Sequence, residues 1–291
     1  MEFMREYPDD ASCLDRLWRD RFAPDGHHAR CPRCERERKF HRTKTRASYT
    51  CDTCGLHVHP MKGTIFEKST TSLHQWFYAM YLMASTRCGI SAKQLEREIG
   101  VGYKTAHRIM KKVRTELMND LDDEPLRGDV EIDETSWGGK PRVPLDRAEA
   151  AAFREAKPTV LGMVERRGRV RARVIASRCG APLSRAVLAV IDVGAAQRFV
   201  GRPVVREDDR GRIDVGSVEA FRVVDDMRGN THTNTIEGFF GNLKTGMRAA
   251  YKKVSLAYLQ SQVDEYAWRY NARHQGKAMF EQLVQRVASV A

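Results

Sequence analysis

Residues 129–140 read DVEIDETSWGGK, and this stretch decides the fold expected for the C-terminal half of the chain. Its polar and apolar side chains alternate, which predicts a β-strand with Val130 and Ile132 on one face. Glu131 and Asp133 then lie on the other face. A Gly-Gly pair ends the strand. The strand therefore places two carboxylates on the same side of a sheet.

The segments that follow are expected to complete a mixed sheet. Residues 158–178 (PTVLGMVERRGRVRARVIASR) predict two further strands joined by the polar turn RRG. Such a three-stranded meander, whose first strand carries a carboxylate, is how an RNase-H-like sheet begins. We expect a helix over 181–192, a short strand ending in acids over 202–209, and a long amphipathic helix over 254–273 packed against the sheet. The predicted class is a multidomain α/β protein.

Two cysteine pairs mark a separate module near the N-terminus. CPRC at residues 31–34 and CDTC at 51–54 are separated by sixteen residues. Each pair puts two thiolates on one tight turn, and two such turns close a tetrahedral shell that suits structural zinc. Short ribbon strands are expected between the pairs, and four unrelated buried thiols are the alternative. The expected zinc ligands are Cys31, Cys34, Cys51 and Cys54.

Residues 72–118 change to helical periodicity. A short helix from Ser91, a turn that contains Gly100 and a longer basic helix form the outline of a helix-turn-helix. The first turns of the second helix would enter a DNA major groove, and basic side chains farther along would meet phosphates. The alternative is a plain helical hairpin with a solvated basic face. The candidate DNA contacts are Lys104, Thr105, Arg108, Lys111, Lys112 and Arg114.

Another carboxylate stands two helical turns before a lysine in HTNTIEGFFGNLK, residues 232–244. Glu237 and Lys244 are seven residues apart, so a helix brings them to one face. Such a pair suits a site in which the carboxylate holds a cation and the lysine holds a DNA phosphate. The alternatives are a first-turn acid favoured by the helix dipole for Glu237 and a solvent-facing acid on an edge strand for Asp133.

The whole chain is basic. Its 50 Lys and Arg against 38 Asp and Glu give a formal net charge of +12. This charge favours a polyanionic partner, because neutralised phosphates release counterions, although a merely basic protein is the alternative. No apolar run approaches the roughly 20 residues that span a bilayer, and the acidic N-terminus is unlike a signal peptide. We therefore expect a cytoplasmic protein without a membrane partner.

Three runs carry a family resemblance: EIDETSWGGK (131–140), HTNTIEGFFGNLK, and DEYAWRYNAR (264–273). With residues 51–77 they resemble DDE transposases of bacterial insertion sequences. More narrowly, they resemble the subgroup with an N-terminal zinc ribbon, a helix-turn-helix and an RNase-H-like core, over residues 10–275. The resemblance implies three domains, with a boundary in the charged segment LDDEPLRG. They are a zinc ribbon with an N-terminal extension (1–66), a helix-turn-helix (67–120) and an RNase-H-like DDE catalytic domain (121–291).

The resemblance also assigns site residues. Asp133 matches the first catalytic Asp of the family, and Glu237 matches its terminal Glu. The second Asp should close a strand before an acidic turn, which favours Asp208 in REDDRG. The segment from Asp208 to Glu237 is shorter than in the family and lacks its usual asparagine–histidine element. The second Asp and the activity of this copy therefore stay open, with Asp209, Asp214 and Asp192 as alternatives.

The implied chemistry is phosphodiester cleavage and strand transfer. Two Mg²⁺ ions about 4 Å apart would be held by Asp133, Asp208 and Glu237, with Asp133 bridging both. Glu131 and Glu134 are candidate supporting acids. The implied partner is double-stranded DNA, both terminal inverted repeats and target, bound by a homo-oligomer in the synaptic complex. The alternatives are a zinc-ribbon and helix-turn-helix regulator, a nuclease without strand transfer, and a catalytically decayed copy.

Overall fold

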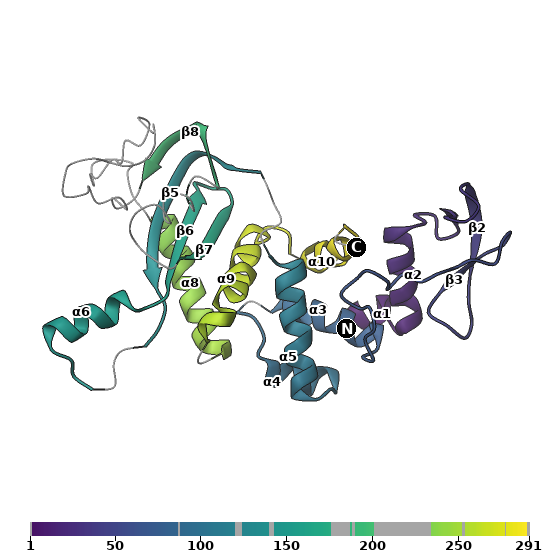
Figure 1. Ribbon diagram of the computed structural model, residues 1–291, viewed down its shortest axis with the longest axis horizontal. Coiled ribbons are helices and arrows are strands. Elements are labelled where there is room, and N and C mark those ends of the chain that lie inside the picture. Colours follow the sequence, from purple (N-terminus) through teal and green to yellow (C-terminus); the bar gives the residue numbers. More distant parts are fainter. Residues whose placement is uncertain are drawn as a thin grey trace. The chain divides into compact units, whose positions relative to one another are not determined.

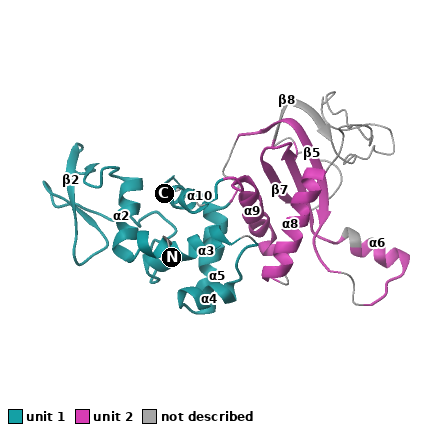
Figure 2. Cartoon of the chain, turned by 180° about the vertical axis from the view of Figure 1, so that it is seen from behind, with its two compact units in different colours: residues 1–118, 275–291 teal, residues 119–274 magenta. Residues whose placement is uncertain are grey.

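The computed structural model of the chain forms two compact units (Figures 1 and 2). It describes residues 2–86, 88–119, 124–139, 143–175, 187, 190–200, 234–251, 254–276 and 278–289. Unit 1 comprises Met1–Met118 with Gln275–Ala291, and unit 2 is Asn119–His274. Among the helices so described, none is long and apolar enough to cross a membrane.

The two units divide close to the expected boundary at residue 120, but the C-terminal segment lies elsewhere than the sequence suggests. The sequence places residues 121–291 in one domain, whereas helix α10 (Ala278–Ser289) packs with α2 and α3 of unit 1. The buried Phe280 explains this: its ring lies 5.8 Å from that of Phe3 and 5.7 Å from that of Tyr7. Unit 2 is thus inserted between two segments of unit 1.

The N-terminal part of unit 1 is a small antiparallel sheet with strand order β1-β2-β3-β4. Its strands are β1 (His28–Arg30), β2 (Glu37–Arg42), β3 (Tyr49–Cys51) and β4 (His57–Val58). Helices α1 (Glu2–Glu6) and α2 (Asp10–Arg21) precede it. The fully buried Trp18 of α2 stacks on Tyr49, with ring centroids 4.2 Å apart. The short strands predicted between the cysteine pairs are therefore present and rest on α2.

The next part of unit 1 is helical, and two of its helices start at serine caps. Ser72 and Gln75 form a capping box before α3, and the Ser91 hydroxyl accepts from the Gln94 amide before α4. Gly100 ends α4 in the left-handed region, at φ 69°. The helices are α3 (Leu73–Ser85), α4 (Ala92–Ile99), α5 (Tyr103–Lys112) and the π-helical turn η1 (Val113–Leu117).

Unit 2 is built on a four-stranded sheet with order β7-β6-β5-β8. The strands are β5 (Leu126–Ser136), β6 (Thr159–Glu165), β7 (Val170–Ile175) and β8 (Ile191–Val200). The first three pair antiparallel, which confirms the predicted meander, and β8 pairs parallel with β5. Helix α6 (Arg147–Glu155) lies in the connection between β5 and β6.

The fourth strand differs from its prediction. The sequence predicts a helix through residue 192 and a strand over 202–209, but β8 already begins at Ile191. The apolar β-branched residues at its two ends suit a strand as well as a helix, and periodicity does not separate these in a short segment. Residues 202–209 lie outside the described part of the chain.

Two apolar clusters cover the two faces of this sheet. One contains Val130 and Ile132 of β5 with Leu161 and Met163 of β6. The other joins β6 and β7 to helices α8 (Asn234–Tyr251) and α9 (Leu256–Asn271). Figure 1 shows α8 and α9 against this side of the sheet. The amphipathic helix predicted over 254–273 is therefore confirmed, and α8 covers the sheet face opposite Val130 and Ile132.

The outer edge of β7 is covered by two amide side chains of α9. Gln260 accepts from the Val174 amide (2.7 Å) and donates to the Ala172 carbonyl (3.2 Å). Asn271 bonds both the amide and the carbonyl of Val170, at 2.7 and 3.0 Å. These contacts satisfy backbone groups that an edge strand otherwise leaves open to another strand.

Candidate metal centre and active site

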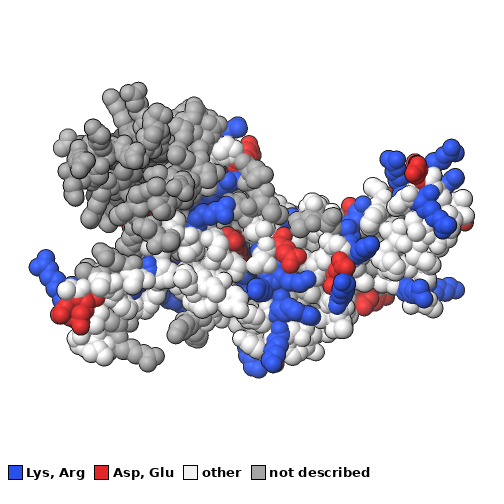
Figure 3. All heavy atoms as spheres, in the orientation of Figure 1, with Lys and Arg blue, Asp and Glu red and all other residues white. Residues whose placement is uncertain are grey.

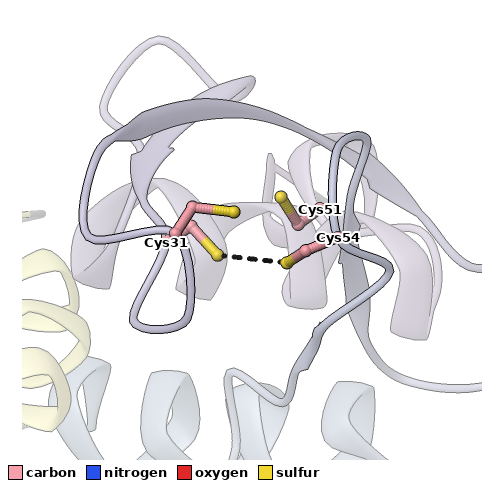
Figure 4. A group of neighbouring side chains, drawn as sticks. Cys31, Cys51 and Cys54 are labelled. Atoms are coloured by element: carbon pink, nitrogen blue, oxygen red, sulfur yellow. Dashed lines mark hydrogen bonds between the residues drawn. The ribbon is translucent and has the colours of Figure 1, made fainter.

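The four cysteines lie on two turns of the same construction (Figure 4). The Cys31 amide donates to the Arg36 carbonyl and the Cys51 amide to the Leu56 carbonyl, both at 2.9 Å. Each turn is completed by a residue at positive φ, which is Glu35 in one and Gly55 in the other. The two knuckles face each other and place all four sulfurs within 4.8 Å of one another, as a single tetrahedral metal ion requires.

The thiols of Cys31 and Cys34 have different pKa values. Burial works against the Cys31 thiolate, but the backbone amides of Cys34 and Arg33 outweigh it and lower the pKa of Cys31 to about 7. Hydrogen bonding to Cys54, together with burial, raises the pKa of Cys34 to about 12. The Cys31 and Cys54 sulfurs are 3.6 Å apart. Amides aimed at sulfur favour thiolates, which are the form that binds metal, so the cluster fits a zinc ribbon.

In unit 2, Asp133 lies on the sheet face that α8 covers. It pairs with Gly162 of β6, in register with Glu131 opposite Val164. Gly162 allows a close approach of the helix, because a Cβ there would stand 2.7 Å from Ile236 and 2.8 Å from Phe240. The half-buried Asp133 carboxylate is therefore on the sheet face next to the helix that carries Glu237.

Helix α8 carries Glu237 and Lys244 on its surface. Glu237 is exposed and Lys244 is half-buried. Burial first, and then the positive charge of Arg248, lower the pKa of Lys244, while the negative charge of Asp133 opposes them. The structure thus brings Lys244 within electrostatic reach of Asp133, and Glu237 stands two turns earlier on the same helix face.

The buried Glu131 makes a different contact from the one expected of a supporting acid. Its side chain is fully buried and accepts from the amides of Thr235 and Ile236, at 2.9 and 3.1 Å. The Thr235 hydroxyl and the Arg166 guanidinium also donate to it, at 2.9 and 3.1 Å. Glu134 pairs with Leu161, so it lies on the opposite face from Asp133. Glu131 therefore binds the start of α8, and Glu134 faces away from it.

Comparison with known proteins identifies the family of unit 2. Residues 125–271, half of the chain, match the ISXO2-like transposase domain. The chain belongs to the ISXO2-like transposase family. This confirms the resemblance to DDE-type transposases of insertion sequences, and the matched span contains Asp133, Glu237 and Lys244.

One curated relative of the chain is a protein of Halobacterium salinarum described as an uncharacterized protein in transposable element ISH50. It is 35% identical over 106 residues, which is 36% of this chain and 35% of the relative. The chain therefore spans about a third of the length of the curated relative that it matches. No solved structure matches the chain.

Of the four candidates for the second Asp, the structure describes the backbone position of Asp192 alone. Asp208, Asp209 and Asp214 lie outside the described residues. Asp192 stands next to Ile191, which pairs with Leu126, seven residues before Asp133 along β5. At about 3.3 Å per residue, this separates the two backbones by roughly 20 Å. The end of β8, at Val200, pairs with Glu131 instead.

The candidate DNA-reading residues differ in exposure in unit 1. Lys104, Arg108 and Lys111 are exposed and, at spacings of four and three, form one stripe along α5. Thr105 is half-buried. The Lys112 ammonium donates to the Ile65 carbonyl at 3.2 Å. Arg114 is only 5% exposed, so the sequence prediction that it meets phosphates does not fit its burial.

The contact between Glu131 and α8 could not be predicted from the sequence. The strand pattern places Glu131 on the face of Asp133, and a carboxylate on a covered face needs donors. Its main partner, Thr235, is 104 residues away, and no local spacing connects the two. The sequence indicated that an acid lies on a covered strand face, but it did not indicate which groups that acid binds.

Proposed function

We propose that this chain is a metal-dependent transposase that binds the terminal repeats of its element, cleaves DNA and joins strands. The observation that carries the proposal is Asp133 on the sheet face beneath α8, the helix that bears Glu237 and Lys244. Membership of the transposase family supports the reaction class. The residue roles that follow are part of the proposal.

Asp133 and Glu237 supply the oxygen ligands that Mg²⁺ prefers, and Asp208 is proposed as the third ligand. Bound Mg²⁺ would supply an activated water or 3′-hydroxyl and would stabilise the leaving oxygen. Lys244 binds a non-bridging oxygen of the scissile phosphate. Its position near Asp133 supports this role, because a cation there neutralises phosphate charge next to the carboxylates.

Unit 1 provides the proposed DNA-binding surfaces. The stripe Lys104, Arg108 and Lys111 begins at the first turn of α5, the part of a recognition helix that reaches base edges. Figure 3 shows further Lys and Arg side chains over the ribbon. A zinc ion on the four cysteines would fix the ribbon, since so small a sheet has little core of its own.

The test uses the purified full chain with Mg²⁺ and duplex DNA that ends in the terminal repeats of the element. We expect nicking at the 3′ ends and, with target DNA, strand joining. Asp133→Ala should abolish both while DNA binding in a mobility-shift assay is retained, because it removes a metal ligand without altering unit 1. Glu134→Gln, on the other face of the same strand, is the matched control and should keep nicking.

Binding without nicking by the unmodified chain would contradict the enzymatic proposal. The protein would then act as a DNA-binding regulator or as a decayed copy. Nicking without joining would instead identify a nuclease.

A further inference from the structure

The link between β5 and α8 is made by a buried charged group. Glu131 is fully buried, and its two carboxylate oxygens accept from two helix amides, one hydroxyl and one guanidinium. The first amides of a helix have no partner within the helix, and its N-terminus carries partial positive charge. A carboxylate from the sheet therefore satisfies the start of α8 twice over, by hydrogen bonds and by charge.

The spacing of this contact is what connects it to the active site. Glu131 stands two residues before Asp133 on β5, and Thr235 stands two residues before Glu237 on α8. The clamp formed by Glu131, Thr235 and Arg166 thus joins strand and helix at one point just ahead of both candidate metal ligands.

Apolar contacts also join the sheet to this helix. Ile236 and Phe240 of α8 pack over Gly162, and such packing tolerates small slides and rotations better than hydrogen bonds of fixed direction do. A misplacement of about 1 Å can cost a site about a hundredfold in rate. The hydrogen bonds of Glu131 therefore contribute the direction and register that packing alone leaves loose.

We propose that Glu131, itself held by Arg166, is a positioning residue that sets the register of α8 on β5 and so the separation of Asp133 from Glu237. This inference rests on the proposed function and deepens it. Glu131 does not ligate metal in this account, because its two oxygens are directed at the start of α8.

Glu165 offers a matched control on the neighbouring strand. Its carboxylate also accepts from two backbone amides, those of Arg127 (2.9 Å) and Arg169 (3.1 Å). These amides belong to β5 and to the approach to β7, not to α8. Glu165→Gln therefore perturbs a carboxylate–amide contact in the same sheet without touching the clamp.

The experiment compares Glu131→Gln with Glu165→Gln in the zinc-loaded full chain. Hydrogen exchange reports the amides of Thr235 and Ile236, and electron paramagnetic resonance follows Mn²⁺ binding as a stand-in for Mg²⁺. For Glu131→Gln we expect exchange of these amides to accelerate about tenfold and half-saturating Mn²⁺ to rise about tenfold, since residues that orient ligands change metal affinity by about 10–100-fold. In nicking, the Mg²⁺ requirement should rise more than the rate at saturating Mg²⁺ falls.

Thr235→Val is the second variant, because it keeps the carboxylate and both amides and removes one hydroxyl. It should weaken Mn²⁺ binding by a smaller factor than Glu131→Gln does. If Glu131→Gln fails to fold, Thr235→Val still tests whether the clamp affects metal binding. Equal exchange and equal Mn²⁺ affinity in the Glu131 and Glu165 variants would overturn the proposal. So would an unmodified chain that binds no Mn²⁺ in unit 2. Loss of nicking from every protein, with the Mn²⁺ shift retained, would remove the proposed function and leave the positioning role standing.

Discussion

The two candidate metal sites are assembled over very different distances along the chain. Cys31 and Cys54, at the ends of the cysteine cluster, are 23 residues apart and sit on two turns with matching hydrogen bonds. Asp133 lies on β5 and Glu237 on α8, and these elements are joined by the packing of α8 over Gly162 and by the hydrogen bonds of Glu131. The first site is encoded in local spacing, whereas a one-residue slip of β5 would turn Asp133 to the other face.

Loss of a cysteine should have the largest effect and should stay local. We expect Cys34→Ser to lose about one zinc equivalent per chain, because the binding free energy of structural zinc, about 10–16 kcal/mol, is also folding free energy. Metal analysis and hydrogen exchange of residues 28–58 would measure this, with the core of unit 2 unchanged. Cys88→Ser, at an exposed cysteine outside the cluster, is the control. Unchanged zinc content in Cys34→Ser would refute the ligand set.

Helix α10 joins unit 1 from far along the sequence, and a second substitution measures how much its packing contributes to the stability of unit 1. Phe280→Ala should destabilise unit 1 by about 3–5 kcal/mol, because it empties an aromatic cluster with Phe3, Tyr7 and Phe77. Thermal unfolding and DNA binding would report the loss. The exposed Gln285 of the same helix provides the control Gln285→Ala. A melting temperature shared by the two variants would mean that α10 adds little to unit 1.

A third change sharpens the comparison by moving α8 without removing any acid. Gly162→Ala should cost about 1–3 kcal/mol of stability, because its Cβ would overlap Ile236 and Phe240. Nicking should fall further than stability alone explains, since the shift is passed to Glu237. Gly241→Ala, on α8 with open space around it, should instead gain up to about 1 kcal/mol. Full nicking by a well-folded Gly162→Ala protein would show that the helix position is not critical.

The smallest effect is expected at the surface of α5. Arg108→Ala should cost about 1–3 kcal/mol of discrimination between terminal-repeat and unrelated DNA if the side chain reads a base. A uniform loss with a shallower salt slope would assign it to phosphate. Lys112→Ala, whose ammonium bonds the Ile65 carbonyl, should change neither quantity. Binding unaltered by Arg108→Ala would remove α5 from the interface.

Local features of the sequence predicted much of this structure. The cysteine spacing, the serines before α3 and α4, and the alternation over β5 act within a few residues, and each produced the expected element. Burial within α5 and η1 was harder to predict, because the sequence does not show that Lys112 and Arg114 turn inward.

Contacts between segments far apart in the chain could not be predicted from such local sequence features. The Glu131 clamp, the start of β8 at Ile191 and the return of α10 to unit 1 each depend on what a segment packs against. For the candidate active site, the family resemblance suggested Asp133 and Glu237, and the sequence offered Glu131 as a supporting acid without showing that it binds the start of α8. The second acid at Asp208 remains a prediction, because it lies outside the described residues.

The insertion of unit 2 into unit 1 has a consequence for the order of events on the ribosome. Residues 119–274 are synthesised before α10 exists, which at about 5–20 residues per second takes roughly 8–30 s. During this interval the aromatic rings of Phe3 and Tyr7 lack their contacts with Phe280. A nascent chain can therefore complete unit 2 before unit 1, and a product released early by a stop codon or frameshift would leave that apolar surface uncovered for chaperones and proteases.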